Sequence, residues 1–254
     1  MSHPSHRALF VWKRDLDVFL RLWRSEAGGV VGEPLFVLAA MGLGLGVYIG
    51  QVNGQSYLSF IAPGVIVGYA MFGATFECTY GSFIRMEVQR TFEAIIATPL
   101  EVEDVIAGEI VWGATRALVS ALGMLVVLAA FGQVTSPWAV LVPVVALVTG
   151  FTFASLSMVF TAIVPSINSF NYYFTLFITP MFFFSGVFFP LSGLPQAVQW
   201  LAWALPLTHA VSLARAALQG AAHWGLLVDI AWLAVLAAGT FWLALRLMRR
   251  RLIK

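Results

Sequence analysis

The feature that most constrains this fold is a run of 98 residues, from Ala117 to Ala214, without a single Asp, Glu, Lys or Arg. A second charge-free run covers 43 residues, from Pro34 to Phe76. Charged residues make up 10% of the chain and hydrophobic residues 60%, whereas a soluble domain is about 25% charged. These runs predict helices inside a lipid bilayer. They exclude a soluble enzyme, a disordered chain and a nucleic-acid-binding protein.

A spanning helix needs about 20 apolar residues, so each run holds more than one span. Polar or proline-containing breaks fall at residues 51–56, 132–137 and 165–168, and a last apolar run covers residues 226–245. We therefore expect an all-α polytopic membrane protein with one transmembrane domain, residues 1–254. Its six transmembrane helices are expected at residues 32–50, 57–80, 105–131, 138–164, 168–190 and 226–246.

The basic residues predict the orientation of the chain. Of the 14 Lys and Arg residues, 12 lie before the first span, just after the second, or at the end of the sixth. Positively charged loops stay on the cytoplasmic side of a membrane, so both termini are expected there. Arg116 and Arg215 are the two exceptions.

Three segments outside the spans carry their own patterns. Residues 1–28 alternate apolar and charged residues at helical spacing, which predicts an amphipathic helix in the membrane interface. This helix either anchors the chain or packs beside a partner subunit. Residues 190–225 contain two apolar stretches too short to span, which predicts re-entrant outer helices. These helices either cap the mouth of a path or only seal the outer surface.

The third segment, residues 82–104, follows the second span. Seven of the twelve acidic residues fall between Glu77 and Glu109, and apolar residues at 3–4 spacing predict a short helix. Thr98 is the expected N-cap of the next helix, with Pro99 in its first turn and Glu101 completing a capping box. A connection of about 4–6 residues is usual. We therefore favour a docking element over an ordinary loop in the lipid headgroups.

The sequence lacks the motifs of several chemistries. Neither of its two lysines stands in a P-loop, so this chain does not bind ATP by that route. None of the four histidines has an acidic residue at ligand spacing, and the single cysteine forms no cluster. We expect no catalytic residues and no metal site.

Charges in or beside the spans still require an explanation, because a bare charge at the centre of a span costs about 2.5–3.5 kcal/mol. Arg116 is expected to pair with Glu77, either as a structural ion pair or as a latch in a transport path. Aromatic residues crowd the fifth span, facing either lipid or a path for a sugar or lipid. The charged candidates are Glu77, Glu109, Arg116, Arg215 and Asp229; the aromatic candidates are Tyr172, Tyr173, Phe177 and Phe184.

Several short motifs together resemble the membrane subunit of an ABC-2 type exporter, and in particular the permeases of lipo-oligosaccharide exporters. The similarity extends from about residue 10 to the C-terminus. Its motifs are Ala74–Glu77, Arg90–Ala94, Gly108–Glu109, Ile178–Met181, Phe184–Gly186, Phe189–Pro190, Leu194–Pro195, Pro206–His209 and Arg249–Leu252.

The resemblance implies a permease in the bacterial inner membrane that exports a lipo-oligosaccharide or lipid-linked glycan. It implies a homodimer whose first and fifth spans line the path, with two separate ATPase subunits that bind ATP and Mg²⁺. This chain itself would bind no cofactor. A coupling helix would sit in a groove of the ATPase; its residues would be Arg90, Thr91, Phe92, Glu93, Ile96, Thr98 and Pro99.

Two alternatives stay open. Within the same class, the cargo could instead be a small hydrophobic drug or antibiotic. In a different class, the chain could be a membrane-embedded enzyme or an assembly factor that works without an ATPase. An ATPase that associates with the chain favours the transporter, whereas a charged pair buried at midspan favours the enzyme.

Overall fold

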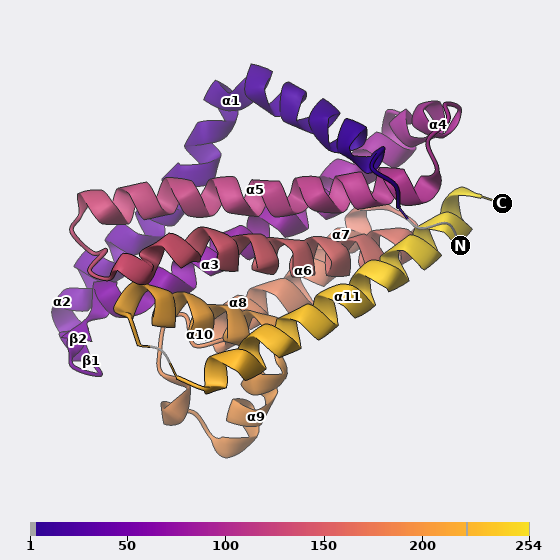
Figure 1. The fold of residues 1–254 in the computed structure, drawn as a ribbon. Coiled ribbons are helices and arrows are strands. Elements are labelled where there is room, and N and C mark those ends of the chain that lie inside the picture. Colours follow the sequence, from indigo (N-terminus) through magenta and orange to yellow (C-terminus); the bar gives the residue numbers. More distant parts are fainter. Residues whose placement is uncertain (1–3, 222, 254) are drawn as a thin grey trace.

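The computed structural model describes residues 4–221 and 223–253, and leaves out the side chains of residues 26, 27, 30 and 31. Nearly all of the described chain is helical, which confirms the all-α polytopic architecture. The long helices lie side by side in one bundle (Figure 1). Five of them are long and apolar enough to cross a membrane: Gly32–Ile49, Tyr57–Val88, Val102–Ala130, Pro137–Ile163 and Gly225–Leu252.

The N-terminal helix does not stop where the sequence pattern suggested. Helix α1 (Ala8–Leu38) begins outside the bundle, turns, and continues into the first span (Figure 1). A π-helical segment η1 (Ala39–Leu45) and a short α2 (Gly46–Ile49) complete that span. The expected interfacial helix over residues 1–28 is thus the first part of a longer helix, and residues 1–3 lie outside the described part of the chain.

A two-stranded hairpin, β1 (Gln51–Val52) and β2 (Gln55–Ser56), joins the first two spans. Its turn residues Asn53 and Gly54 both have positive φ, 53° and 78°. Asn-Gly is the favoured sequence for such tight turns, because these residues tolerate left-handed backbone angles. The sequence analysis treated this stretch only as a polar break.

The second span is also longer than expected. Helix α3 (Tyr57–Phe76) continues through the π-helical turns η2 (Glu77–Gly81) and η3 (Ile84–Val88), so residues 82–88 belong to the end of the span. The short helix α4 (Thr91–Ile96) follows, then α5 (Val102–Ala130). A 3₁₀ turn η4 (Pro137–Leu141) leads into α6 (Val142–Ile163).

The fifth span differs most from the expectation for residues 168–190. After the 3₁₀ turn η5 (Ile167–Ser169), α7 (Phe170–Tyr173), η6 (Phe174–Ile178) and α8 (Thr179–Phe184) form a helix of 15 residues. At 1.5 Å per residue this helix is about 22 Å long, less than the hydrocarbon thickness of about 30 Å. The apolar residues after Phe184 leave the helix at Gly186, whose φ is 75°.

The segment after the fifth span forms two short helices, where two apolar stretches too short to span were found in the sequence. The 3₁₀ turn η7 (Leu191–Gly193) precedes α9 (Gln196–Ala204) and α10 (Pro206–Gln219), which meet at an angle of 85°. Pro206 starts the second helix at this bend. The last helix, α11 (Gly225–Leu252), then runs back along the bundle to the end at which α1 begins (Figure 1). Within the expected 190–225 segment, Ala222 lies outside the described residues.

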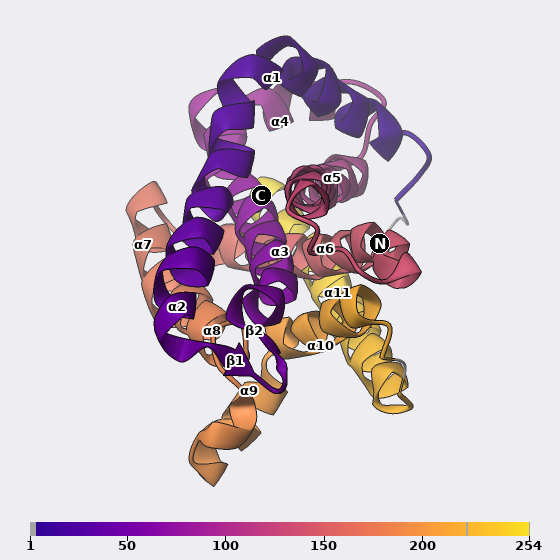
Figure 2. The same cartoon turned by 90° about the vertical axis from the view of Figure 1, so that its left-hand side faces the viewer.

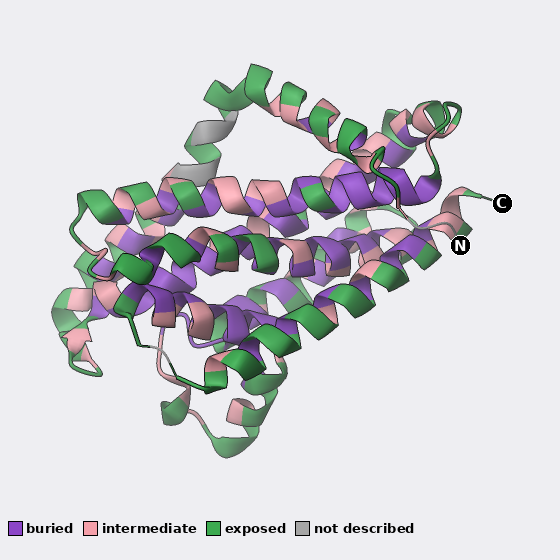
Figure 3. Ribbon diagram, in the orientation of Figure 1, coloured by how far each residue is buried: buried purple, intermediate pink, exposed green. Residues whose placement is uncertain are grey.

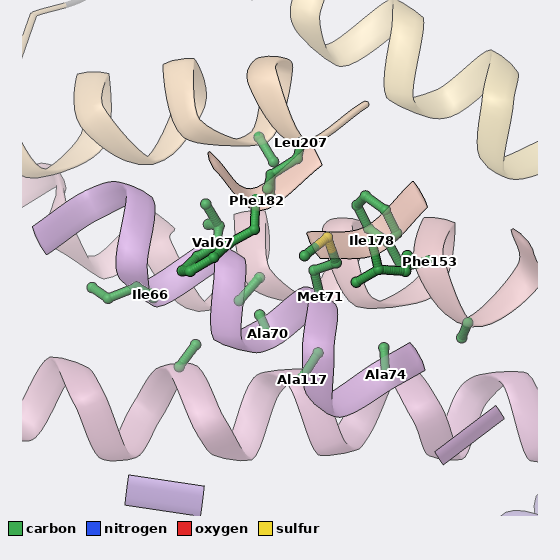
Figure 4. Close-up of a cluster of buried hydrophobic side chains, with 14 of the residues drawn as sticks. Ile66, Val67, Ala70, Met71, Ala74, Ala117, Phe153, Ile178, Phe182 and Leu207 are labelled. Carbon is green, nitrogen blue, oxygen red and sulfur yellow. The ribbon is translucent and has the colours of Figure 1, made fainter. Parts of the chain in front are cut away.

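The core forms around α3, which lies among α5, α6 and α10 (Figure 2). In the most apolar stretch of the second span, which α3 begins, 72% is buried. The corresponding value for the first span is 11%, and its exposed faces appear in Figure 3. Figure 4 shows the α3 side chains at the centre of the core, in contact with neighbouring helices. The residues labelled there are Ile66, Val67, Ala70, Met71, Ala74, Ala117, Phe153, Ile178, Phe182 and Leu207.

Small residues allow these helices to approach closely, which is how helices associate inside lipid. A Cβ added at Gly108 of α5 would stand 2.7 Å from the carbonyl oxygen of Ala8 and 2.6 Å from a Val11 carbon. A Cβ at Gly64 of α3 would stand 2.8 Å from the Cα of Val187. The absence of a side chain at Gly108 therefore lets the start of α1 lie directly against α5.

Candidate coupling and translocation sites

A cluster of charged side chains links three segments near one end of the bundle. Glu109 of α5 is completely buried, and its carboxylate accepts hydrogen bonds from Arg85 Nε at 3.0 Å, Arg14 Nη2 at 2.9 Å and Ser82 Oγ at 2.7 Å. Arg14 comes from α1, whereas Ser82 and Arg85 come from the end of the second span. Bonds to charged groups are the stronger class of hydrogen bond, so Glu109 ties α1 and the second span to α5.

The same cluster contains the pair expected from the sequence. Arg116 Nε lies 3.5 Å from Glu77 Oε2, and Glu77 also pairs with Arg85 at 2.8 Å. Arg14 pairs with Asp15 at 2.7 Å. The six residues of this cluster carry three positive and three negative formal charges, so they compensate one another. We call it the charged network: Arg14, Asp15, Glu77, Arg85, Glu109 and Arg116.

Asp15 is only partly compensated within the charged network. It is 6% exposed, and its Oδ2 atom has no hydrogen-bond partner among the described residues. Burial, reinforced by the Glu109 carboxylate, raises its pKa from 3.8 to about 6, although Arg85 and Arg14 oppose the shift. Because the folded state binds the proton more tightly, Asp15 favours folding most below pH 4. That contribution is lost as the pH rises through 6.

We therefore expect Asp15→Asn to be more stable than the wild type at pH 8, and this advantage to shrink on acidification. The asparagine oxygen still accepts from Arg14 but carries no charge. For the cited shift, linkage predicts that the advantage falls by about 1.4 kcal/mol between pH 8 and pH 5. Melting temperatures of both proteins in detergent across this range test the prediction; a difference that does not change with pH would contradict it.

The short helix α4 projects at the same end of the molecule (Figure 1). Phe92 is completely buried and holds α4 to the bundle. The side chains of Arg90 and Glu93 are 72% and 62% exposed and form a loose ion pair at 3.5 Å. Arg90 has a left-handed backbone with φ 53°, which turns the chain between the second span and α4. The helix thus presents polar side chains while one aromatic residue fixes its position.

The expected start of the next helix at Thr98 is wrong. Thr98 Oγ1 donates to the Ile95 carbonyl at 2.6 Å, so Thr98 ends α4 instead of capping α5. The N-cap of α5 is Glu101, which forms a reciprocal capping box with Asp104 three residues later. Residues 97–99 form a separate turn between the two helices, with Pro99 exposed. The sequence around Pro99 contains two candidate N-caps for α5, Thr98 and Glu101. The structure uses Glu101.

The C-terminal helix fastens this end of the bundle. Arg251 donates to the carbonyl oxygens of Thr161 and Val164 at 2.6 and 2.7 Å, and pairs with Glu87 at 2.8 Å. Arg249 pairs with Glu103 at the start of α5. The basic tail, which the sequence analysis used only for orientation, therefore also braces α6 and both ends of the α4 segment.

A groove with aromatic walls lies beside the charged network. Its volume is about 660 Å³, and it is formed by α1, by α3 with η2, by α5 and by the fifth span. Glu77 and Arg116 line it, so the groove and the charged network share two residues. The aromatic side chains on its walls are Tyr69, Phe72, Phe76, Tyr80 and Phe174. A groove of this size lies in the range of small-molecule sites, about 300–1,000 Å³.

The four aromatic residues proposed from the sequence do not share one face. Tyr172, Phe177 and Phe184 are 70%, 57% and 44% exposed, respectively. Tyr173 is buried against α6, where its ring stacks on Phe160 with centroids 4.4 Å apart. None of the four lines the groove. The groove aromatics come mainly from α3, which the sequence analysis treated only as a span, and no pattern distinguished its groove face from its core face.

A buried pair, Asp229 and His209, lies away from the charged network. Asp229 Oδ1 is 2.6 Å from His209 Nδ1, and His209 Nε2 is 2.9 Å from the Trp203 carbonyl oxygen. The sequence analysis considered only acidic residues at metal-ligand spacing, so it did not reveal this pair, whose members are 20 residues apart. The imidazole ring of His209 thus bridges the Asp229 carboxylate and the Trp203 carbonyl oxygen. This pair joins α10 to α11 behind the 85° bend.

We expect Asp229→Asn to destabilise the protein by about 1.5–3 kcal/mol, the value of a hydrogen bond to a charged group. The asparagine amide can still hydrogen-bond to the imidazole ring, but it no longer offers the ring the negative charge of the carboxylate. The double variant His209→Leu with Asp229→Leu should be less destabilised than the sum of its single variants, because it leaves no buried charge unpaired. Additive melting shifts in detergent would show that the pair does not interact.

Among the residues that the structure describes, no group of three His, Cys, Asp or Glu side chains is placed to hold a metal ion. Cys78 is buried and free. The assembled features are those of a multi-pass helical membrane protein with a short projecting helix, a charged network near it and a groove beside that network.

The comparisons place this architecture in a known family. Residues 9–218 match the model of the ABC-2 type transporter family, and the chain belongs to that family. It is therefore the membrane subunit of an ABC transporter. It is 41% identical to nodulation protein J of Rhizobium leguminosarum bv. trifolii and 38% identical to nodulation protein J of Sinorhizobium fredii, over 96% of this chain and 93% of each relative. It is 26% identical to the inner membrane transport permease YadH of Escherichia coli, over 80% of this chain and 78% of the relative.

Proposed function

We propose that the chain is the permease of an ATP-driven exporter, works as a homodimer with two ATPase subunits, and moves a lipid-linked or lipo-oligosaccharide outward across the bacterial inner membrane. The observation that carries this proposal is the arrangement of α4. A short projecting helix that exposes Glu93, is anchored by Phe92 and lies near the charged network is suited to receive a movement from outside and transmit it to the spans.

The transmission has a physical route. α4 is followed directly by α5, which carries Glu109 and Arg116, and α4 is preceded by the π-helical turns that carry Glu77 and Arg85. A displacement of α4 therefore acts on both sides of the charged network, and through Arg14 on α1. Because Glu77 and Arg116 also line the groove, a rearrangement of the charged network changes the shape of the groove.

Exposed apolar side chains on the first and fifth spans support a second copy of this chain on the groove side. The first span is only 11% buried, with Phe36, Val47 and Tyr48 exposed by 74%, 79% and 88%. Tyr172 and Phe177 of the fifth span are exposed as well. In the proposed dimer the first and fifth spans of two copies face each other, and the two grooves flank the path. With a lipid-linked cargo, the apolar part stays against these exposed aromatic faces while the sugar part follows the groove.

The cargo follows from the resemblance to lipo-oligosaccharide permeases, and it agrees with the groove. Tyrosine rings and hydroxyls at Tyr69 and Tyr80, together with Glu33 and Ser120, offer both stacking and hydrogen bonding to a sugar. A small hydrophobic drug would use only the rings. Both termini are proposed to be cytoplasmic, since Arg249, Arg250 and Arg251 close α11 at the end that also carries α4.

The test reconstitutes the chain with its ATPase in liposomes and follows two cargoes, a fluorescent lipo-oligosaccharide and a hydrophobic dye. We expect ATP-dependent movement of the lipo-oligosaccharide, reduced by Tyr69→Leu and Tyr80→Leu, with dye movement little changed. Movement of the dye alone would support a drug exporter instead. Movement of the lipo-oligosaccharide without any ATPase would overturn the proposal.

A further inference from the structure

A second polar cavity opens at the outer end of the molecule, away from the groove. Its volume is about 340 Å³, and its walls come from the β hairpin, α3, the end of α9 and one face of α10. Arg215 lines it, and no Asp or Glu is among its described lining residues. Its other polar lining residues are Asn53, Thr208, Ser212, Gln219 and His223.

Arg215 is incompletely satisfied in this outer cavity. Its Nη2 donates to the Gly186 carbonyl at 2.9 Å, and its guanidinium carbon lies 4.4 Å from the Phe60 ring centroid. Its Nε is buried and has no hydrogen-bond partner among the described residues. Asp229, the acid on the neighbouring α11, is bonded to His209. A guanidinium carries five N–H donors in a planar fork suited to phosphate, sulfate or carboxylate oxygens, so the outer cavity carries a positive charge without a matching acid.

An apolar cavity adjoins the outer cavity. It has a volume of about 440 Å³, lies between α6, α10 and α11, and is lined almost entirely by aliphatic side chains together with Trp138. Val144 and Ile230 on its walls are 55% and 52% exposed, so it is open to the surroundings of the bundle. Ala216 lines both cavities. A positive polar cavity and an open apolar cavity thus meet at one small residue of α10.

We propose that these two cavities form one binding site for an anionic amphiphile. The headgroup, a phosphate or sulfate ester, bonds to Arg215 in the outer cavity, and an acyl chain crosses Ala216 into the apolar cavity. The adjoining apolar cavity is what favours an amphiphile over a free anion. The site is separate from the groove and from α4, and it stands whether or not the exported cargo is a lipo-oligosaccharide.

The experiment uses the full-length chain in nanodiscs that contain equal amounts of phosphatidylglycerol and phosphatidylcholine. Native mass spectrometry then counts the lipids retained as collision energy is raised. We expect the wild type to keep phosphatidylglycerol after phosphatidylcholine is lost. Arg215→Gln should lower phosphatidylglycerol retention roughly tenfold, the effect of one hydrogen bond between charged groups. Arg250→Gln, an exposed arginine at the other end of α11, is the matched control and should change nothing.

A third variant tests the junction without removing charge. Ala216→Phe fills the space between the two cavities and should also lower phosphatidylglycerol retention. Equal retention of both lipids by the wild type, or retention unaffected by both variants, would overturn the proposal. If inorganic phosphate alone raises the melting temperature of the wild type and of Ala216→Phe equally, the site binds free anions and the amphiphile proposal is wrong. The wild-type lipid selectivity and Ala216→Phe decide the matter even if Arg215→Gln does not fold. No arm requires the ATPase or the cargo.

Discussion

Glu109→Leu is expected to destabilise the protein by about 3–5 kcal/mol, the cost of removing one partner from a buried ion pair. Glu109 is completely buried, and its carboxylate accepts from two arginines and one serine. Without it, Arg14 and Arg85 are left facing each other with only Asp15 and Glu77 to compensate them. Membrane levels and the melting temperature in detergent should both fall.

Two comparisons separate this effect from a general loss of packing. Arg85→Met combined with Glu109→Leu should recover part of the lost stability, because apolar residues then replace both charges. Glu93→Gln removes an exposed carboxylate of the same type and should leave the melting temperature unchanged. If Glu109→Leu proves as stable as the wild type, the charged network does not hold α1 and the second span to α5.

Glu93→Arg is expected to abolish ATP-dependent transport while leaving the folded protein intact. Glu93 lies on the exposed face of α4, where reversal of its charge removes the contact with Arg90 and presents a positive surface to the ATPase. Complementary charge supports association across an interface, and reversing one charge removes that complementarity. In liposomes that contain both subunits, we expect transport to be lost. The rate of ATP hydrolysis should no longer depend on the presence of cargo.

The neighbouring residue provides the contrast. Phe92→Ala removes the buried ring that holds α4 in place and should cost about 3–5 kcal/mol, as truncation of a core phenylalanine does. Its defect should therefore include a lower melting temperature, which Glu93→Arg should not show. Normal transport by Glu93→Arg would place the docking surface elsewhere on the chain.

Long-range features of the fold could be predicted from the sequence because the bilayer imposes one simple rule. A span must be long and apolar, so two charge-free runs and a last apolar run located five of the helices, and the 85° pair was expected from two apolar stretches too short to span. Local detail was less predictable. Apolar residues after Phe184 continue the composition of a span, but backbone geometry at Gly186 ends it. Composition does not record where a π-helical turn extends a helix, as it does from Glu77 to Val88.

The charged network could likewise be predicted only in part from the sequence. A buried charge demands a partner, and that argument led from Arg116 to Glu77, which the structure places 3.5 Å apart. It did not reveal that Glu109 is the centre of the charged network, because its partners Arg14 and Arg85 lie outside the apolar runs and were used only to orient the chain. Likewise the 20-residue separation of His209 and Asp229 carries no spacing signal, since only the fold brings α10 and α11 together.

The central claim is that an exposed α4 couples this permease to a separate ATPase, and co-purification tests it most directly. The tagged chain is isolated from its native host in mild detergent, and the eluate is assayed for partner mass and ATP hydrolysis. The account predicts an ATPase present at one copy per permease chain, retained by the wild type and lost with Glu93→Arg. A folded, oligomeric permease that carries no ATPase under several detergents would contradict it.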